Sequence, residues 1–290
     1  MTRTRAAWSR RAVMAGLAVA AAGARVPARA AEPFRFGLTP VLLDSDIALL
    51  AQMETFLQEA LDRPVDLVKR RTYQEISALL LSGEIDAAWI CGFPFVQHRD
   101  RLALVVVPLY HHQPLYQAYL IVPKDRDVAT WQELRGDVHA FSDPDSNSGH
   151  LVTWALLAEA HETPQSFFRE TIYTYGHRNV VRAVAAGLAQ SGSVDGYVWD
   201  VISNRDPALA SRTRVLRVSE LLGFPPIACL APNSQTPQIQ LLSRALQDVG
   251  RSESGRKLLG MLELDGFAVE DPSLFDPIAA KYELVKARGT

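Results

Sequence analysis

Cysteine is scarce in this chain of 290 residues, which contains only Cys91 and Cys229 and no CxxC spacing. Two cysteines are too few for a disulfide-rich scaffold, and their separation excludes the local thiolate motifs of structural zinc sites. Histidine and the acidic residues form no cluster with metal-ligand spacing, since the pair His111-His112 has no third partner nearby in the sequence. We therefore expect no metal and no cofactor, while a disulfide between the two cysteines stays open.

An excess of basic residues is also missing. The 30 lysines and arginines are matched by 32 acidic residues, which gives a formal charge of −2. Six of the arginines lie among residues 1–30, so the rest of the chain holds 24 basic and 32 acidic residues and a formal charge near −8. Such a charge disfavours nucleic acid as a partner, although local dipoles and amides can still hold a small anion.

No apolar run is long enough to span a bilayer. The short run from Ala15 to Ala22 follows the paired arginines Arg10-Arg11 and precedes the small residues Ala28-Arg29-Ala30. This order predicts an export signal of the twin-arginine type over residues 1–30, cleaved after Ala30 or Ala31, while the general secretion route stays open. We expect the mature protein to be soluble, periplasmic and without a membrane span.

Short apolar runs alternate with helical patterns from Phe34 onward, which is typical of an α/β fold. The first set has strands at residues 34–38, 65–68, 86–90, 104–109 and 116–122, with helices near 47–61 and 73–82. The second set has strands at residues 138–141, 171–175, 194–198, 215–218 and 227–230, with helices at 148–160 and 180–187 and a helical pattern from 238 onward.

Two comparable sets joined by extended segments predict two lobes with a ligand cleft between them. The expected crossing segments are residues 118–123 and 225–231. Lobe 1 then comprises residues 31–118 together with 225–290, and lobe 2 comprises residues 119–224.

The stretch from Phe141 to Leu151 is the most informative part of the chain. A strand stops at Phe141, small polar residues follow, and a helix is expected to begin near Ser148. The first amides of a helix lack intrahelical acceptors and carry the positive end of its dipole, so hydroxyl and amide donors converge where an oxyanion can bind. The spacing equally allows Ser146 or Ser148 to act only as the N-cap of that helix.

Four motifs, taken in order, resemble the periplasmic phosphate-, phosphite- and phosphonate-binding proteins. They are Tyr116-Gln117-Ala118-Tyr119-Leu120-Ile121-Val122, Thr130-Trp131-Gln132-Glu133-Leu134-Arg135-Gly136, Asp143-Pro144-Asp145-Ser146-Asn147-Ser148-Gly149 and Gly176-His177. The resemblance covers nearly all of the chain after the expected signal. It implies the two-lobed type II periplasmic binding protein fold, closing over a small tetrahedral oxyanion, and delivery of that ligand to an ABC transporter permease.

The resemblance also implies a set of ligand-binding residues. Ser146, Ser148 and the amide of Gly149 match the anion-binding turn of the family, Tyr116 matches an aromatic hydroxyl at the lobe crossing, and His177 matches a histidine that faces the ligand. Hydroxyl and amide donors to an oxyanion form charge-assisted hydrogen bonds, and a histidine adds a donor that can become charged. The alternatives are that Tyr116 is an ordinary strand aromatic and that His177 caps a helix beginning near Val180.

Tyr73 and Asp200 complete the expected set. Tyr73 begins a helix that follows a strand, where the family often places a ligand-facing hydroxyl, although a tyrosine that only packs fits that position too. Asp200 is expected near the carboxyl end of the strand 194–198, where relatives that hold an aminoalkyl phosphonate use carboxylates for the ammonium group. A helix N-cap is the competing role for Asp200.

Two departures from the family pattern bear on the ligand. Arg178 stands where the family commonly has an acid, and the segment from Gly223 to Ile227 offers no carboxylate. Both disfavour aminoethylphosphonate and favour phosphate, phosphite or a simple alkylphosphonate. Cys91 is expected where a buried strand runs out toward the cleft, and some relatives that sense arsenite use a cysteine ligand in this fold. The alternatives are that Cys91 only packs or that it forms a disulfide with Cys229.

Functions of three classes fit these residues. The first is an ABC transporter binding protein, expected as a monomer. The second is an oxyanion or arsenite sensor that presents its ligand to a histidine kinase, with Cys91 as a ligand. The third is a hydrolase built on Ser148, His177 and Asp200, which the missing G-x-S-x-G nucleophile motif disfavours, so we expect no enzyme.

Overall fold

The computed structural model describes residue 2, residues 32–40 and residues 47–288. The export signal expected over residues 1–30 lies outside these residues, apart from the isolated Thr2. No helix in the described part of the chain is both long and apolar enough to cross a membrane.

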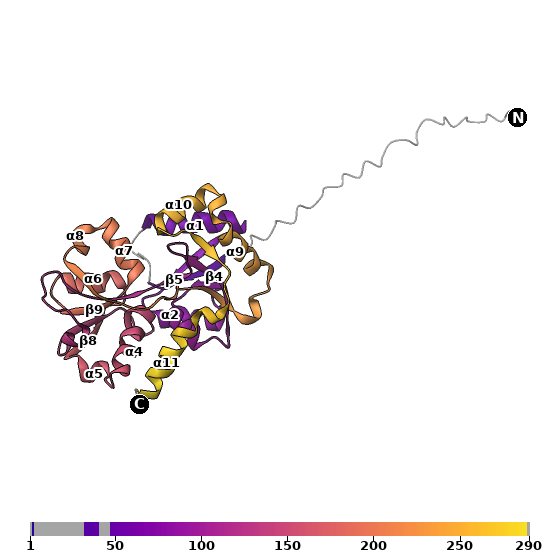
Figure 1. The fold of residues 1–290 in the computed structure, drawn as a ribbon. Coiled ribbons are helices and arrows are strands. Elements are labelled where there is room, and N and C mark those ends of the chain that lie inside the picture. Colours follow the sequence, from indigo (N-terminus) through magenta and orange to yellow (C-terminus); the bar gives the residue numbers. More distant parts are fainter. Residues whose placement is uncertain (1, 3–31, 41–46, 289–290) are drawn as a thin grey trace. The chain divides into compact units, whose positions relative to one another are not determined.

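The first of two sheets has the strand order β13-β4-β12-β3-β1-β2 (Figure 1). Its strands are β1 (Phe34–Leu38), β2 (Val65–Lys69), β3 (Ala87–Trp89), β4 (Leu102–Leu109), β12 (Ile227–Leu230) and β13 (Gly266–Ala268). Strands β2, β1 and β3 are parallel, whereas β12 runs antiparallel to β3 and β4. Because β12 comes from far along the chain, this sheet is discontinuous in sequence.

The second sheet repeats the arrangement of the first, with the order β10-β6-β9-β7-β8. Its strands are β6 (Ala118–Pro123), β7 (Val138–Phe141), β8 (Glu170–Tyr173), β9 (Ser191–Asp195) and β10 (Thr213–Val218). Strands β8, β7 and β9 are parallel, and β6 runs antiparallel beside β9. The predicted α/β fold with two comparable sets is confirmed by these two sheets.

A short ladder joins the segments that run between the sheets. Strand β5 (Leu115–Tyr116) pairs with β11 (Leu222–Gly223), and Leu222 lies opposite Tyr116. The residues expected as crossings, 118–123 and 225–231, instead form β6 in the second sheet and β12 in the first. The chain therefore passes between the sheets next to β5 and β11, a few residues from the expected places.

Helices cover both sheets (Figure 1). With the first sheet lie α1 (Ile47–Leu61), α2 (Tyr73–Ser82), α3 (Gly92–Gln97), η3 (Ala231–Asn233), α9 (Pro237–Gln247), η4 (Val249–Arg251), α10 (Glu253–Leu262), η5 (Pro272–Phe275) and α11 (Asp276–Arg288). With the second lie η1 (Trp131–Leu134), η2 (Asn147–Leu151), α4 (Val152–Glu159), α5 (Pro164–Phe167), α6 (His177–Ala185), α7 (Gly196–Arg205) and α8 (Pro207–Ala210). Helix α11 contacts both α3 and α4, so it links elements of the two sheets.

Local chemistry explains where the elements that lead to the site begin and end. Helix α2 starts with a capping box, in which the Thr72 hydroxyl accepts from the Glu75 amide at 3.2 Å and the Glu75 carboxylate accepts from the Thr72 amide at 3.0 Å. It ends at Gly83, whose φ of 76° is left-handed and suits glycine. Strand β9 stops at Asp195, because the Asp195 carboxylate caps α7 by accepting from the Val198 amide at 3.3 Å.

Two expectations about the second half of the chain are wrong. Residues 238–290 do not form only helices, since β13 (Gly266–Ala268) adds a short antiparallel strand beside β4. Its three residues are too few to show a strand pattern in the sequence. The strand expected at 194–198 ends at Asp195, and Tyr197 and Val198 belong to α7.

A partly buried ion pair holds the loop after β6 against the start of β7. The guanidinium of Arg126 contacts both carboxylate oxygens of Asp137, at 2.5 and 2.9 Å, and donates to the Gln190 carbonyl at 2.7 Å. Asp137 is 6 % exposed and directly precedes β7, the strand that ends at the expected anion-binding turn. The bidentate geometry satisfies both charges and fixes the position of β7.

Replacing Asp137 by alanine is expected to lower the free energy of unfolding by about 1–3 kcal/mol, because the partly buried Arg126 guanidinium loses its bidentate partner. Asp127→Ala, at an exposed acid on the same loop, is expected to change it by less than about 0.5 kcal/mol. Urea unfolding of both variants measures the difference. Equal losses would contradict a structural role for this ion pair.

Candidate functional site

The turn after β7 leads into a helix whose first turn is wider than an α-helical turn. Ser146 is its N-cap, and the Ser146 hydroxyl accepts a hydrogen bond from the Gly149 amide at 3.0 Å. The next turn, η2, has π-helical geometry, and the Leu151 amide donates to the Ser146 carbonyl at 3.0 Å. The helix therefore begins at Asn147 instead of Ser148, and its N-cap residue is Ser146 and not Ser148.

Three buried polar atoms of this turn have no hydrogen-bond partner among the described residues. They are the hydroxyls of Ser142 and Ser148 and the side-chain oxygen of Asn147. All three residues are at most 1 % exposed. Ser148 lies close enough to Tyr116 and Asp195 to lower the pKa of both, but it makes no well-aligned hydrogen bond. Because buried polar atoms are normally paired, this concentration marks a place suited to a polar ligand.

Gly149 allows this turn to pack closely against its neighbours. A Cβ atom at this position would lie 1.9 Å from the hydroxyl oxygen of Ser142 and 3.0 Å from Cε1 of His177. The backbones of the two residues are also hydrogen-bonded, since the Ser142 amide donates to the Gly149 carbonyl at 3.1 Å. Any larger residue would therefore push the turn away from His177.

Tyr73 joins the first turn of α2 to the second sheet. Its amide donates to the carboxylate of Asp143 at 3.2 Å, and its hydroxyl lies 3.2 Å from Nε2 of His177. Tyr73 is fully buried. Its hydroxyl thus points toward the expected site residues, and the alternative that it packs on the surface is wrong.

Asn147 provides a second connection between the turn after β7 and residues from the first half of the chain. Its amide donates to the sulfur of Cys91 at 3.2 Å, and its side-chain amide donates to the Tyr116 hydroxyl at 2.8 Å. Cys91 lies between β3 and α3, and Tyr116 lies in β5. The structure therefore brings Cys91 and Tyr116 from the first half of the chain against the turn after β7.

His177 is the first residue of α6, and both nitrogens of its ring are engaged. The Asp195 amide donates to Nδ1 at 3.1 Å, while Nε2 meets the Tyr73 hydroxyl. Helix α6 begins at His177 itself, so the expected start near Val180 is wrong. His177 does not serve as a side-chain cap of α6, because its ring points to Asp195 and Tyr73.

The site has no cationic group among these residues. Burial lowers the pKa of His177 to about 3, so its ring is neutral at physiological pH. Burial raises the pKa of Cys91 to about 12 and the pKa of Tyr73 and Tyr116 well above the ordinary value. Asp195 is also buried, which raises its pKa to about 7. The site therefore presents neutral hydrogen-bond donors next to buried carboxyl groups.

Among the described residues, Asp200 makes no hydrogen bond with the site residues above, although its charge is close enough to Asp195 to raise the pKa of that carboxyl. It belongs to α7, beyond the end of β9, and accepts hydrogen bonds from the hydroxyls of Tyr110 at 3.0 Å and Tyr119 at 3.3 Å. The N-cap of α7 is Asp195, so a capping role for Asp200 is wrong. The expected position at a strand end is wrong for the same reason.

Several residues of the site were not singled out from the sequence. Asp143 and Asn147 lie inside the motif that carries the family resemblance, so their position gave a signal. Ser142 and Asp195 gave none, because their roles depend on the packing of β7 and β9 against neighbouring elements. Among the residues that the structure describes, no group of three or more His, Cys, Asp or Glu side chains could hold a metal ion.

The two cysteines are free and buried. Ala228 of β12 lies opposite Ala88 of β3, so Cys229 and Cys91 are about four residues apart along this ladder. At roughly 3.3 Å per residue their separation is about 13 Å, which is far beyond disulfide distance. The disulfide alternative is therefore wrong for this structure.

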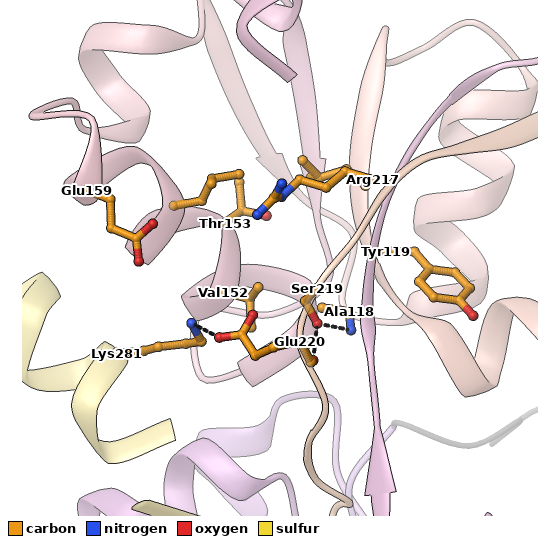
Figure 2. A pocket seen from close by; sticks show the side chains of 11 residues that line it. Ala118, Tyr119, Val152, Thr153, Glu159, Arg217, Ser219, Glu220 and Lys281 are labelled. Carbon is orange, nitrogen blue, oxygen red and sulfur yellow. Dashed lines mark hydrogen bonds and ion pairs between the residues drawn. The ribbon is translucent and has the colours of Figure 1, made fainter. Parts of the chain in front are cut away.

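A separate small pocket lies apart from the turn after β7 in its lining residues (Figure 2). It measures about 60 Å³ and is lined by β6, β10, α4 and α11. The charged groups Lys281 and Glu220 form an ion pair there, and the Ser219 hydroxyl accepts from the Ala118 amide at 2.9 Å (Figure 2). None of the eight expected ligand-binding residues lines this pocket.

Comparisons with known proteins agree with this geometry. Residues 36–275 match the model of a family described as "ABC transporter, phosphonate, periplasmic substrate-binding protein". The chain is similar in structure to a binding protein component of a phosphonate ABC transporter from Pseudomonas aeruginosa, with a TM-score of 0.81, 18 % identity, and coverage of 89 % of this chain and 88 % of that one.

Two further solved structures share the fold. PhnD1 from Prochlorococcus marinus in complex with methylphosphonate has a TM-score of 0.78 and 14 % identity, covering 87 % of this chain and 98 % of that one. A histidine kinase sensor domain has a TM-score of 0.53 and 14 % identity, covering 79 % and 96 %. The neighbours are two-lobed periplasmic binding proteins, so the predicted type II fold is confirmed.

Replacing Gly149 by alanine is expected to lower the free energy of unfolding by about 1–3 kcal/mol, because the new methyl group overlaps the Ser142 hydroxyl. Adding Ser142→Gly removes the closest clashing atoms and should restore part of the loss. Gly250→Ala is the control, since nothing lies within 4 Å of a Cβ at that position. Denaturant unfolding of the four proteins tests this, and a neutral Gly149→Ala variant would contradict the close packing.

Both thiols are expected to resist alkylation in the native protein, because Cys91 and Cys229 are at most 2 % exposed and burial raises the pKa of each. Unfolding without a reducing agent should expose two reactive thiols per chain. Mass spectrometry after alkylation counts them. An unfolded, unreduced protein that takes up no label would show a disulfide and contradict the structure.

Proposed function

Because the chain belongs to the family of periplasmic substrate-binding proteins of phosphonate ABC transporters, we propose that it captures a small phosphonate-class oxyanion and delivers it to a permease. Members of this family bind substrates for transport and are not enzymes. The proposed ligands are a simple alkylphosphonate, phosphate or phosphite. The proposed place of action is the periplasm, which is where proteins of this family work.

The observation that carries this proposal is the set of buried donors where the two sheets meet. The hydroxyls of Tyr73, Tyr116 and Ser148 lie around the turn that begins at Ser146, and each belongs to a buried residue. Donors in a site that excludes water form strong charge-assisted hydrogen bonds to an anion. We propose Ser146, Ser148, Gly149, Tyr73, Tyr116 and Cys91 as residues that surround the ligand, with Asn147 as an addition from the structure.

The proposed lobes follow the two sheets. The first lobe contains the sheet built on β1, and the second contains the sheet built on β7, so the donors come from both. Tyr73 begins α2 beside the first sheet, Tyr116 lies in the β5–β11 ladder between the sheets, and Ser148 belongs to the second. Binding between the lobes then couples capture of the ligand to closure, which is the form a permease would recognise.

A small ligand without an amino group fits the charges better than aminoethylphosphonate. Arg178 forms an ion pair with Asp206 at 2.7 Å, and both residues lie with the second sheet. Asp200 is engaged by Tyr110 and Tyr119 instead of facing the turn. Neither of these acids is available for an ammonium group, and the carboxyl group next to Ser148, that of Asp195, is used to cap α7.

An arsenite sensor is the less favoured function. Trivalent arsenic prefers thiolate ligands, whereas burial raises the pKa of Cys91 to about 12 and keeps it as a thiol. The likeness to a histidine kinase sensor domain reflects the fold alone. We therefore propose transport. In this proposal Cys91 is a neutral residue that lines the site and accepts a hydrogen bond from the Asn147 amide.

A thermal-shift screen with methylphosphonate, phosphate, phosphite, arsenite and methanesulfonate tests this function. A ligand at a hundredfold excess over its Kd is expected to stabilise the protein by about 2.7 kcal/mol. We expect at least one of methylphosphonate, phosphate and phosphite to raise the Tm, and arsenite and methanesulfonate to leave it unchanged. A response to arsenite alone, or to none of the five, would contradict the proposal.

Ser148→Ala should weaken binding of the responding oxyanion about tenfold, because one charge-assisted hydrogen bond is lost. Ser211→Ala is the matched control, since Ser211 is exposed and follows α8, away from the turn. Isothermal titration calorimetry measures both affinities. An unchanged affinity of Ser148→Ala would remove Ser148 from the site.

A further inference from the structure

His150 lies inside the turn η2 and is buried, with 6 % of its surface exposed. Its ring packs edge to face against Phe141 of β7, with centroids 4.9 Å apart, and its centroid lies 5.2 Å from that of Trp154 in α4. Nδ1 lies 2.7 Å from the Pro144 carbonyl oxygen, and Nε2 lies 3.2 Å from the Tyr173 hydroxyl. Both ring nitrogens are therefore engaged by groups of the protein itself, and neither is left for a ligand.

The chemistry of these two partners determines which nitrogen carries the hydrogen. A carbonyl oxygen can only accept, so Nδ1 of His150 carries the hydrogen and donates to Pro144. The ring is neutral at physiological pH, because burial lowers its pKa to about 4. Nε2 therefore has no hydrogen and accepts from the Tyr173 hydroxyl.

The bond between His150 and Pro144 closes a loop around the turn that begins at Ser146. Residues 145–149 lie between its two ends, and they carry hydroxyl and amide donors proposed for the ligand. A bond that joins the ends of a loop restricts all of the residues inside it. The conformation of these donors therefore depends on a side chain whose own nitrogens are both used elsewhere.

Tyr173 and Phe141 anchor the His150 ring on the second sheet. They lie opposite each other in the parallel pair of β7 and β8, and the His150 ring contacts both of them. Binding residues are held more precisely when they are attached to strands than when they depend on a loop alone. Through His150, the loop is attached to two neighbouring strands.

We propose that His150 is a positioning residue of the anion-binding turn: it joins the Pro144 carbonyl to the Tyr173 hydroxyl and so holds the donors of residues 145–149 in place before the oxyanion binds. This inference rests on the proposed function. Donors that are already ordered bind more tightly, because less conformational entropy is lost when the ligand arrives. Substitution of His150 should therefore weaken binding although no contact with the ligand is removed.

Two substitutions at position 150 separate the donor from the bulk of the ring. The amide nitrogen of His150→Asn can take the place of Nδ1 and donate to Pro144, whereas His150→Leu is of similar size to histidine but has no donor. We expect His150→Leu to raise the Kd for methylphosphonate about tenfold, and His150→Asn to stay within about threefold of the wild type. Equal losses for the two variants would overturn the proposal.

Tyr173→Phe tests the other end of the connection, because it removes the hydrogen bond to Nε2 and keeps the aromatic ring. We expect it to raise the Kd about fivefold in the wild-type background. In the His150→Leu background the same change should alter the Kd by less than about twofold, since Tyr173 acts only through His150. Losses that multiply in the double variant would contradict this connection.

His139→Leu is the matched control for stability. His139 is a second buried histidine of the same sheet, and its two ring nitrogens lie 2.8 Å from the hydroxyls of Ser191 and Ser193. Its replacement is expected to lower the Tm, as His150→Leu does, but to leave the Kd within about twofold. If His139→Leu weakened binding as much as His150→Leu, the loss would follow stability alone and the proposal would be overturned.

NMR spectroscopy of the protein with ¹⁵N-labelled histidine tests the hydrogen positions directly. We expect the His150 ring to be neutral at pH 7, with hydrogen on Nδ1 and none on Nε2, both without ligand and with methylphosphonate bound. The signals of His150 are those that disappear in His150→Asn. The opposite tautomer or a charged ring would overturn the proposal. If the wild-type protein binds none of the oxyanions in the screen, the proposed function fails instead, which differs from a wild type that binds and a His150→Leu variant that binds equally well.

Discussion

The double contact of Tyr73 is the interaction on which the rest of the site depends. Its amide is held by the carboxylate of Asp143 and its hydroxyl by His177, so one residue at the start of α2 is fixed by two elements of the second sheet. The capping box formed by Thr72 and Glu75 stabilises the same first turn of α2 from within the helix. Together these bonds bring the buried hydroxyl of Tyr73 to the turn that begins at Ser146.

The absence of cationic groups from this cluster limits what it can bind. Asp143 and Asp195 are buried nearby, and burial raises the pKa of both. An anion must therefore be held by hydroxyl and amide dipoles, whose strength in a site closed to water replaces formal charge. The neutral state of His177 agrees with this lack of charged donors, because a buried charged ring would cost desolvation free energy.

Much of the fold could be predicted from the sequence, because strands such as β1 and β7 are apolar runs and α1 and α2 have helical periodicity. Strand β13 could not, since three residues carry no pattern. His177 was found in a family motif, and Tyr73 and Cys91 were found from their expected places just after strands. The structure places Tyr73 against His177 and Cys91 against Asn147. Asp200 was misplaced because the sequence does not show that Asp195 caps α7, and the roles of Ser142 and Asp195 arise only from packing.

The structure of the complex with methylphosphonate, determined by crystallography, tests the central claim most directly. We predict phosphonate oxygens within hydrogen-bond distance, about 2.5–3.0 Å, of the hydroxyls of Tyr73, Tyr116 and Ser148. A ligand bound away from the turn that begins at Ser146, with none of these hydroxyls within hydrogen-bond distance of it, would contradict this account.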